Sequence, residues 1–89
     1  MKALNRTTRF RRDLRKENRR DPGVQDILKP VISDLLMGKA LPQKMNDHPL
    51  SGDWKDHRDC HVKPDLVLIY KTDDDAVTLV RLGSHSELF

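Results

Sequence analysis

The chain has 89 residues, enough for one domain with a small core, because a chain of this size buries only about 60–65% of its unfolded surface. A single cysteine, Cys60, excludes an internal disulfide framework and fits a reducing compartment. With 17 Lys and Arg against 14 Asp and Glu, the net charge of +3 favours acidic or phosphate-bearing partners. The longest apolar run, Leu66 to Tyr70, is far too short to span a membrane, and the first residues lack the apolar segment of a signal peptide. We therefore expect a soluble, cytoplasmic protein without a membrane partner.

The first predicted element is a largely solvated helix from Thr7 or Thr8 to Arg20. Its apolar residues, Phe10 and Leu14, are spaced by four among charged side chains, which predicts a narrow buried stripe. Either threonine is a suitable N-cap. The many arginines of this helix form a solvated face or a surface that follows a phosphate backbone.

A second helix is predicted from Val24 to Met37, after a turn at residues 21–23. Apolar residues recur here at the three-four spacing of one helical face. Pro30 removes a backbone hydrogen bond inside a helix, so we expect either a kink there or a helix that starts near Lys29. Gly38 is a suitable C-terminal stop.

The second half of the chain is predicted to be β-rich. Residues 41–55 contain two prolines and a glycine, which predicts a loop that carries His48. Residues 58–62 and 66–70 then read as a hairpin, and residues 76–82 as a third strand of an antiparallel meander. The sequence thus predicts an α+β fold, with two N-terminal helices packed on a small antiparallel β-sheet, as a single domain of residues 1–89.

Histidines are concentrated in short blocks beside predicted turns: DHPL contains His48, HRDCHVKPD contains His57 and His61, and GSHSELF contains His85. Imidazole is the side chain best suited to exchange a proton near neutrality, with an ordinary pKa of about 6.5. Such blocks on a small basic protein suggest acid/base chemistry on an anionic substrate.

The strand pattern places His61 on the open face of the sheet. If residues 58–62 form a strand, Cys60 and Val62 point to one face, and Asp59 and His61 point to the other. Asp65 follows across the turn, close enough in sequence to orient an imidazole or to carry a proton. The plainer interpretation is a solvated histidine and a turn-forming aspartate.

Three further residues are candidates for substrate contacts. Arg81 precedes His85 at the end of the last strand, and its planar donors suit a phosphate undergoing transfer, although an exposed surface arginine explains it equally well. Trp54 and Phe89 are each able to stack on a base, but Trp54 is equally able to cover the core from its loop.

A metal site is considered because His57 and His61 have the four-residue spacing of a helical ligand pair, with Cys60 between them. The strand pattern separates these side chains and places Cys60 on the opposite face. We expect neither a metal nor another cofactor, and we expect Cys60 to be a buried packing residue.

The blocks DHPLSGDWKDHRDCHVKPDLVLIYK and RLGSHSELF resemble the YafQ branch of the RelE/ParE toxin superfamily, the toxins of bacterial type II toxin-antitoxin pairs. The resemblance covers about half of the chain closely and the rest in layout. It implies a ribosome-dependent mRNA interferase, an endoribonuclease that cuts the message in the ribosomal A site. It also implies attack of the ribose 2′-hydroxyl on the adjacent phosphate, without a metal.

Carried over by motif, the resemblance implies that His48, His61, Asp65 and His85 form the acid/base set, with Arg81 and Phe89 as substrate contacts. His85 or Asp65 would be the base and His61 or His85 the acid. His57 departs from the family pattern, in which a tyrosine also occurs at that place.

The same resemblance implies a cognate antitoxin as partner, besides the ribosome and mRNA, with operator DNA bound only through the antitoxin complex. The alternatives are a non-catalytic toxin like the gyrase inhibitors of the ParE branch, and an RNA-binding module. A third alternative, a metal-dependent nuclease, lacks an acidic cluster.

Overall fold

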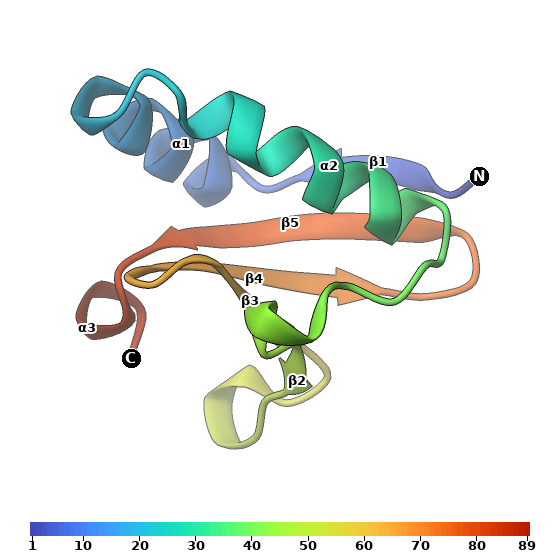
Figure 1. The fold of residues 1–89 in the computed structure, drawn as a ribbon. Coiled ribbons are helices and arrows are strands. Elements are labelled where there is room, and N and C mark those ends of the chain that lie inside the picture. The colour runs from blue at the N-terminus through green and yellow to red at the C-terminus, as the bar shows by residue number, and fades with distance from the viewer.

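The computed structural model describes the whole chain, Met1 to Phe89, and shows two long helices on one face of a five-stranded sheet (Figure 1). A short C-terminal helix and the segment around β2 lie on the other side of that sheet (Figure 1). None of the helices is both long and apolar enough to cross a membrane. The elements, in chain order, are β1 (Ala3–Arg6), α1 (Thr8–Arg20), α2 (Val24–Leu36), the short 3₁₀ helix η1 (Gln43–Met45), β2 (His48–Pro49), the 3₁₀ helix η2 (Gly52–Trp54), β3 (Arg58–Lys63), β4 (Leu66–Thr72), β5 (Ala76–Gly83) and α3 (His85–Leu88).

Helix α1 forms as predicted and begins at a side-chain cap. Thr7 is the N-cap, and its hydroxyl accepts a hydrogen bond of 3.0 Å from the backbone N–H of Phe10. The apolar stripe faces inward, because Phe10 is almost fully buried and Leu14 packs against the same core. The remaining α1 side chains are mostly charged and reach solvent, so the prediction of a solvated helix with a narrow buried face is confirmed.

Helix α2 begins at Val24 and retains Pro30 inside it, so the alternative start near Lys29 is wrong. The turn before the helix allows the earlier start, because the N–H of Val24 donates to the carbonyl of Asp21. Gly38 ends the helix as predicted: its φ of 69° is left-handed, and Lys39 N–H then reaches back to the carbonyl of Asp34.

The sheet has the strand order β1-β5-β4-β3-β2 and is mixed. The antiparallel meander of β3, β4 and β5 confirms the prediction, but β1 adds a parallel edge beside β5 that the prediction of a purely antiparallel sheet lacks. Strand β1 has only four residues, most of them exposed, and they show no clear alternation of buried and exposed positions. Its pairing depends on a strand more than 70 residues away in the sequence, so no local signal predicts it.

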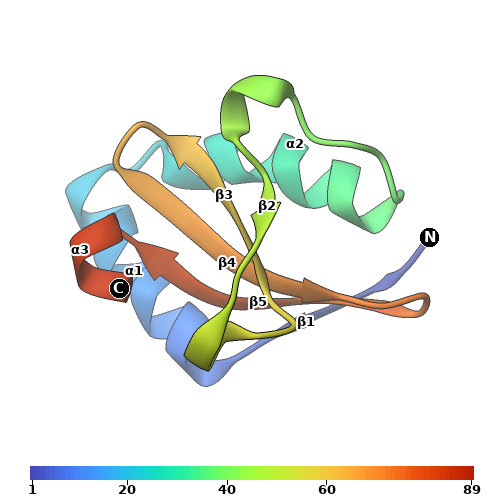
Figure 2. The same ribbon diagram turned by 90° about the horizontal axis from the view of Figure 1, so that it is seen from below.

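The sheet is buried on both faces, by a different apolar cluster on each. Helices α1 and α2 cover one face, where Cys60, Val62 and Leu68 belong to the larger cluster, so the prediction of Cys60 as a packing residue is confirmed. On the opposite face, Val67 and Ile69 of β4 form a smaller cluster with Leu88 of α3. Figure 2 shows the molecule from this side, with β2 crossing in front of the sheet and α3 beside the end of β5. This second face carries the candidate site, because Asp59 and His61 alternate with Cys60 and Val62 along β3.

Candidate active site

A continuous row of paired residues crosses the sheet on the face opposite the long helices. His48 of β2 pairs with Asp59 of β3, Asp59 pairs with Ile69 of β4, and Ile69 pairs with Arg81 of β5. Directly paired residues have their side chains on the same face. The loop predicted for residues 41–55 therefore contains a short strand, and that strand places His48 beside β3.

Asp59 is the buried charged residue at the centre of this arrangement. Only 3% of it is exposed, and its Oδ1 atom has no hydrogen-bond partner. His48 Nδ1 lies 3.1 Å from that oxygen, but it is hydrogen-bonded at 2.7 Å to the carbonyl of Asn46. We therefore treat the contact of His48 with Asp59 as electrostatic attraction without hydrogen-bond alignment.

Three histidines act electrostatically on Asp59. Burial raises the pKa of the Asp59 carboxyl above its ordinary value of 3.8, and the charges of His48, His61 and His85 oppose that rise. Three of the four residues predicted as the acid/base set thus lie within electrostatic range of one carboxylate, to which the sequence analysis gave no role, and His48 is in direct contact with it. The sequence did contain a signal for this role of Asp59, because Asp59 lies two residues before His61 and therefore on the same face of the predicted strand.

The backbone contact of His48 fixes its tautomer. Asn46 has a left-handed φ of 50°, at the end of η1, and its carbonyl faces His48 Nδ1. In the neutral ring Nδ1 therefore carries the hydrogen, because a carbonyl only accepts. The other ring nitrogen, Nε2, is then free to take up a proton, and 42% of the side chain is exposed.

His61 and Asp65 are not joined in the way their spacing suggested. His61 is half-buried on β3, where it pairs with Val67. Asp65 lies exposed in the turn between β3 and β4, and neither a hydrogen bond nor an ion pair links it to His61. A role for Asp65 in the reaction remains a prediction.

His85 and Phe89 form an exposed aromatic pair at the C-terminus. Their ring centroids are 4.8 Å apart and the planes are tilted by 38°. Helix α3 holds them in place through a capping box, in which Ser84 and Glu87 each accept a hydrogen bond from the other's backbone N–H. Phe89 is 48% exposed, so the pair is accessible to a planar partner.

Trp54 and Arg81 already have partners within the protein. Trp54 packs against the Val67 and Ile69 cluster and meets the His57 ring edge-on at 5.3 Å, which supports the interpretation that it covers the core. The Arg81 guanidinium pairs with Asp13 of α1, with Nε 2.7 Å from Oδ2. The structure thus places Arg81 in the site row but anchors its head group toward α1.

No three histidine, cysteine, aspartate or glutamate side chains converge closely enough to hold a metal ion. Cys60 lies on the helix-covered face, and burial raises the pKa of its thiol to about 12, which keeps it protonated at neutral pH. His57 Nδ1 is hydrogen-bonded to the carbonyl of Lys55 at 3.0 Å, which leaves Nε2 as its free ring nitrogen. Cys60 and His61 alternate along β3 and face opposite sides of the sheet, so they do not converge on one ion.

Comparison of the sequence with known proteins identifies relatives over its whole length. Residues 2–89 match the family described as the bacterial toxin of type II toxin-antitoxin systems, YafQ. The mRNA interferase toxin YafQ of Escherichia coli strain B / BL21-DE3 is 35% identical over 82 residues, which cover 90% of this chain and 87% of that protein. The YafQ of strain K12 is 51% identical over 49 residues, a match that spans about half of either chain, 55% and 53%.

Solved structures show the same fold. A copper-bound mutant toxin from Helicobacter pylori superposes with a TM-score of 0.94 at 42% identity, over 100% of both chains. The DinJ-YafQ complex of E. coli contains a chain with a TM-score of 0.90 at 33% identity, over 100% of this chain and 99% of that one. The chain described here belongs to the YafQ family of type II toxin-antitoxin toxins.

Proposed function

We propose that this protein is an mRNA interferase, the toxin of a toxin-antitoxin pair, and that it cuts messages in the A site of translating ribosomes. The observation that carries the proposal is the buried Asp59 carboxylate, with His48 3.1 Å from it, His61 two residues along the same face of β3, and His85 near enough for its charge to act on Asp59. Membership of the YafQ family supports it, because the E. coli relatives are named mRNA interferase toxins.

The reaction that suits these groups is transfer of a phosphodiester to the neighbouring ribose oxygen. A base removes the proton of the 2′-hydroxyl, the 2′-oxygen forms a bond to phosphorus, and the bond from phosphorus to the 5′-oxygen breaks. An acid gives the departing oxygen its proton, which leaves a 2′,3′-cyclic phosphate and a 5′-hydroxyl. Imidazole serves in both roles near neutral pH. Each bond that forms or breaks and each proton that moves is accounted for by the RNA, the acid and the base.

The roles follow from exposure and charge. His85 is the most accessible of the three histidines and is the proposed base, with Asp65 as the alternative, whereas His61 is the proposed acid. Asp59 stabilises the positive charge that forms on an imidazole when it takes the 2′ proton, because charges interact more strongly in a partly buried site. His48 offers its free Nε2 to the same proton-transfer set.

Substrate contacts come from the ends of the site. The exposed Phe89 ring, beside His85, is proposed to stack on a base of the message. Arg81 is proposed to stabilise charge on the phosphate at the cut. Trp54 supports this face from within its apolar cluster, and we propose that its exposed edge borders the substrate.

The proposed partners match the charge of α1. The arginines of this helix are exposed and suit an acidic antitoxin or ribosomal RNA. An antitoxin partner is further supported by the DinJ-YafQ complex of the E. coli relative. Operator DNA would be bound only through that complex, and the toxin would act in the cytoplasm, where ribosomes are. The exposed arginines are Arg9, Arg11, Arg12, Arg15, Arg19 and Arg20.

The test is primer extension on messages held by programmed ribosomes, in intact magnesium buffer, after EDTA treatment of the toxin alone. New 5′ ends should appear on ribosomes and not on free RNA. His61→Ala and His85→Ala should each reduce cutting by about 10²-fold or more, the usual contribution of a general acid or base. Both variants should keep the thermal midpoint of the wild type within a few degrees.

His57→Ala is the matched control, because His57 lies outside the group around Asp59 and should leave cleavage nearly unchanged. Full activity of both site variants would overturn the assigned site. An absence of new ends with the wild type would overturn the interferase proposal and favour a non-catalytic toxin, such as a gyrase inhibitor.

A further inference from the structure

Helix α1 replaces a missing strand along part of β5. Strand β1 pairs with β5 only from Ala76 to Leu79, so the next residues of β5 have no strand partner on that side. Two α1-side residues bond to the backbone there instead: the Thr7 hydroxyl donates to the carbonyl of Val80 at 2.7 Å, and the Asp13 carboxylate accepts from the N–H of Leu82 at 3.0 Å. Without Asp13, the backbone N–H of Leu82 would have no hydrogen-bond acceptor.

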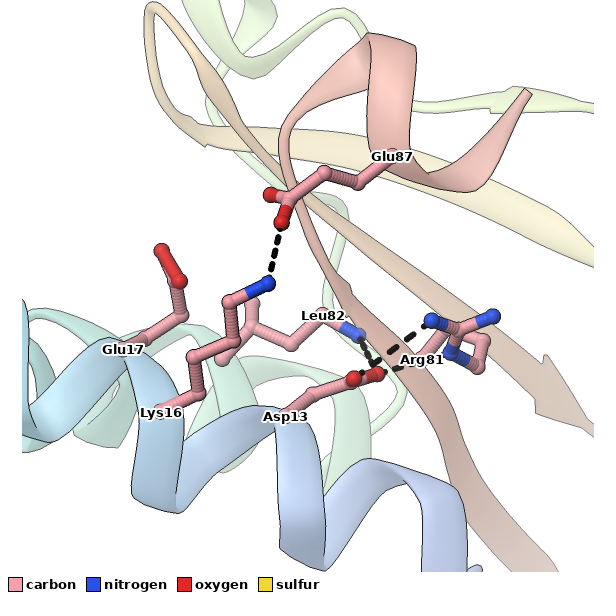
Figure 3. Close-up of a pocket in the computed structure, with 6 residues that line it drawn as sticks. All are labelled: Asp13, Lys16, Glu17, Arg81, Leu82 and Glu87. Carbon is pink, nitrogen blue, oxygen red and sulfur yellow. Dashed lines mark hydrogen bonds and ion pairs between the residues drawn. The ribbon is translucent and has the colours of Figure 1, made fainter.

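The same carboxylate holds Arg81. Oδ2 accepts a hydrogen bond from Arg81 Nε at 2.7 Å, and Oδ1 accepts a longer one from Nη2 at 3.4 Å (Figure 3). The two side chains are only 15% and 16% exposed, which restricts their motion. A pair made through Nε and one terminal nitrogen leaves Nη1 and its hydrogens unused, so the guanidinium still has donors for an anion.

The cavity beside this pair does not suit an anion. It has a volume of about 280 Å³ and lies between α1 and α3, and Lys16 and Arg81 face three carboxylates in it, those of Asp13, Glu17 and Glu87 (Figure 3). Three negative charges against two positive ones repel a phosphate. The side of Arg81 that faces α1 is therefore an anchor, and phosphate contact belongs to its opposite side.

We infer that Asp13 is a positioning residue for the cleavage reaction, which fixes the Arg81 guanidinium for the phosphate at the cut. The inference rests on the proposed function. It also connects α1 with the site row, because Arg81 is aligned across the sheet with Ile69 and Asp59. Asp13 touches neither substrate nor reacting atoms and acts only through Arg81.

The test is a double-mutant cycle of Asp13→Asn and Arg81→Ala, with cleavage measured on programmed ribosomes under single-turnover conditions. Asparagine retains an acceptor for the Leu82 N–H and removes the charge that orients Arg81. We expect Asp13→Asn to lower the maximal rate by about 10- to 100-fold, the cost of a misplaced catalytic group, with little change in the ribosome concentration for half-maximal rate. In the Arg81→Ala background the same change should cost less than about twofold.

Glu17→Gln is the matched control, because it removes a negative charge one turn further along α1, at the same cavity, without contact to Arg81. It should leave the rate unchanged. Equal losses from Asp13→Asn with and without Arg81 would overturn the inference and leave Asp13 a purely structural residue. A faster Asp13→Asn variant would overturn it too, since Asp13 would then restrain Arg81. A wild type without cleavage would overturn both the proposed function and this inference, whereas an active wild type with uncoupled variants would overturn the inference alone.

Discussion

The candidate site contains a buried carboxylate whose negative charge is unfavourable for stability. Asp59 is nearly fully buried and one of its oxygens lacks a hydrogen bond. Its pKa in the folded protein is raised above 3.8, mainly by burial. The folded state therefore binds this proton more tightly than the unfolded state, so the stability cost develops as pH rises above 3.8 and is complete at neutral pH.

Asp59→Asn should stabilise the protein and impair it as a nuclease. The neutral amide removes the buried charge, and a gain of order 1 kcal/mol would raise the thermal midpoint by about 4–8 °C in a domain of this size. Thermal scans at neutral pH and at pH 3.5 or below should show the gain in the first condition and its loss in the second. Cleavage should fall at least about tenfold, because the imidazolium loses its counter-charge.

Asp53→Asn provides the control, since Asp53 is exposed in η2 and should change neither quantity. A destabilised Asp59→Asn protein with normal cleavage would show that Asp59 stabilises the fold and contributes nothing to the reaction.

At the level of elements, α3 is held by α1. Lys16 and Glu87 form an ion pair of 2.5 Å, and the hydrogen bond from Lys16 is the first cause that lowers the pKa of Glu87, from 4.5 to about 2. A depressed pKa in the folded state means that the pair stabilises the protein fully above pH 4.5, and that this stabilisation is lost as pH falls toward 2. Since α3 carries His85 and Phe89, acid should weaken the attachment of the aromatic pair.

Glu87→Gln should isolate the ion pair from the helix cap. Glutamine still completes a capping box, so the substitution removes only the charge pairing with Lys16 and the longer one with Arg20, at 3.7 Å. We expect a loss of about 0.2–1 kcal/mol at neutral pH, the usual range for an exposed pair, that disappears near pH 2. Urea unfolding of the wild type and the variant at both pH values measures it. Asp26→Asn, which removes the more exposed pair with Lys29, should have the smaller effect at neutral pH, and the reverse order would contradict this account.

At the scale of the whole molecule, the sheet separates the face covered by α1 and α2 from the face that carries the candidate site. Leu68 and Ile69 are adjacent on β4 and both fully buried, but Leu68 faces the helices, whereas Ile69 lies between Asp59 and Arg81 in the site row. Because Leu68 and Ile69 are equally buried, substituting each in turn compares the two faces of the sheet without a difference in burial.

Leu68→Ala and Ile69→Ala should each cost about 2–5 kcal/mol in the free energy of unfolding, because both create a cavity. Only Ile69→Ala should also slow cleavage by the folded protein, by several-fold or more, since the residues on either side of it would shift. Denaturant unfolding and single-turnover cleavage, measured on the same preparations, distinguish the two effects. Equal cleavage rates in the two variants would mean that packing behind the site does not position it.

The sequence by itself determined the two helices, the meander and the face of β3 on which His61 lies, because hydrophobic periodicity, caps and turn residues are local signals. It also identified the histidine blocks. Only the tertiary structure decided that β1 joins β5, that His48 pairs with Asp59, and that Asp13 holds Arg81. The last of these contacts joins residues 68 positions apart, and no local pattern specifies it. The predicted association of Asp65 with His61 relied on short spacing and on the family resemblance, and spacing across a turn does not fix the direction of a side chain.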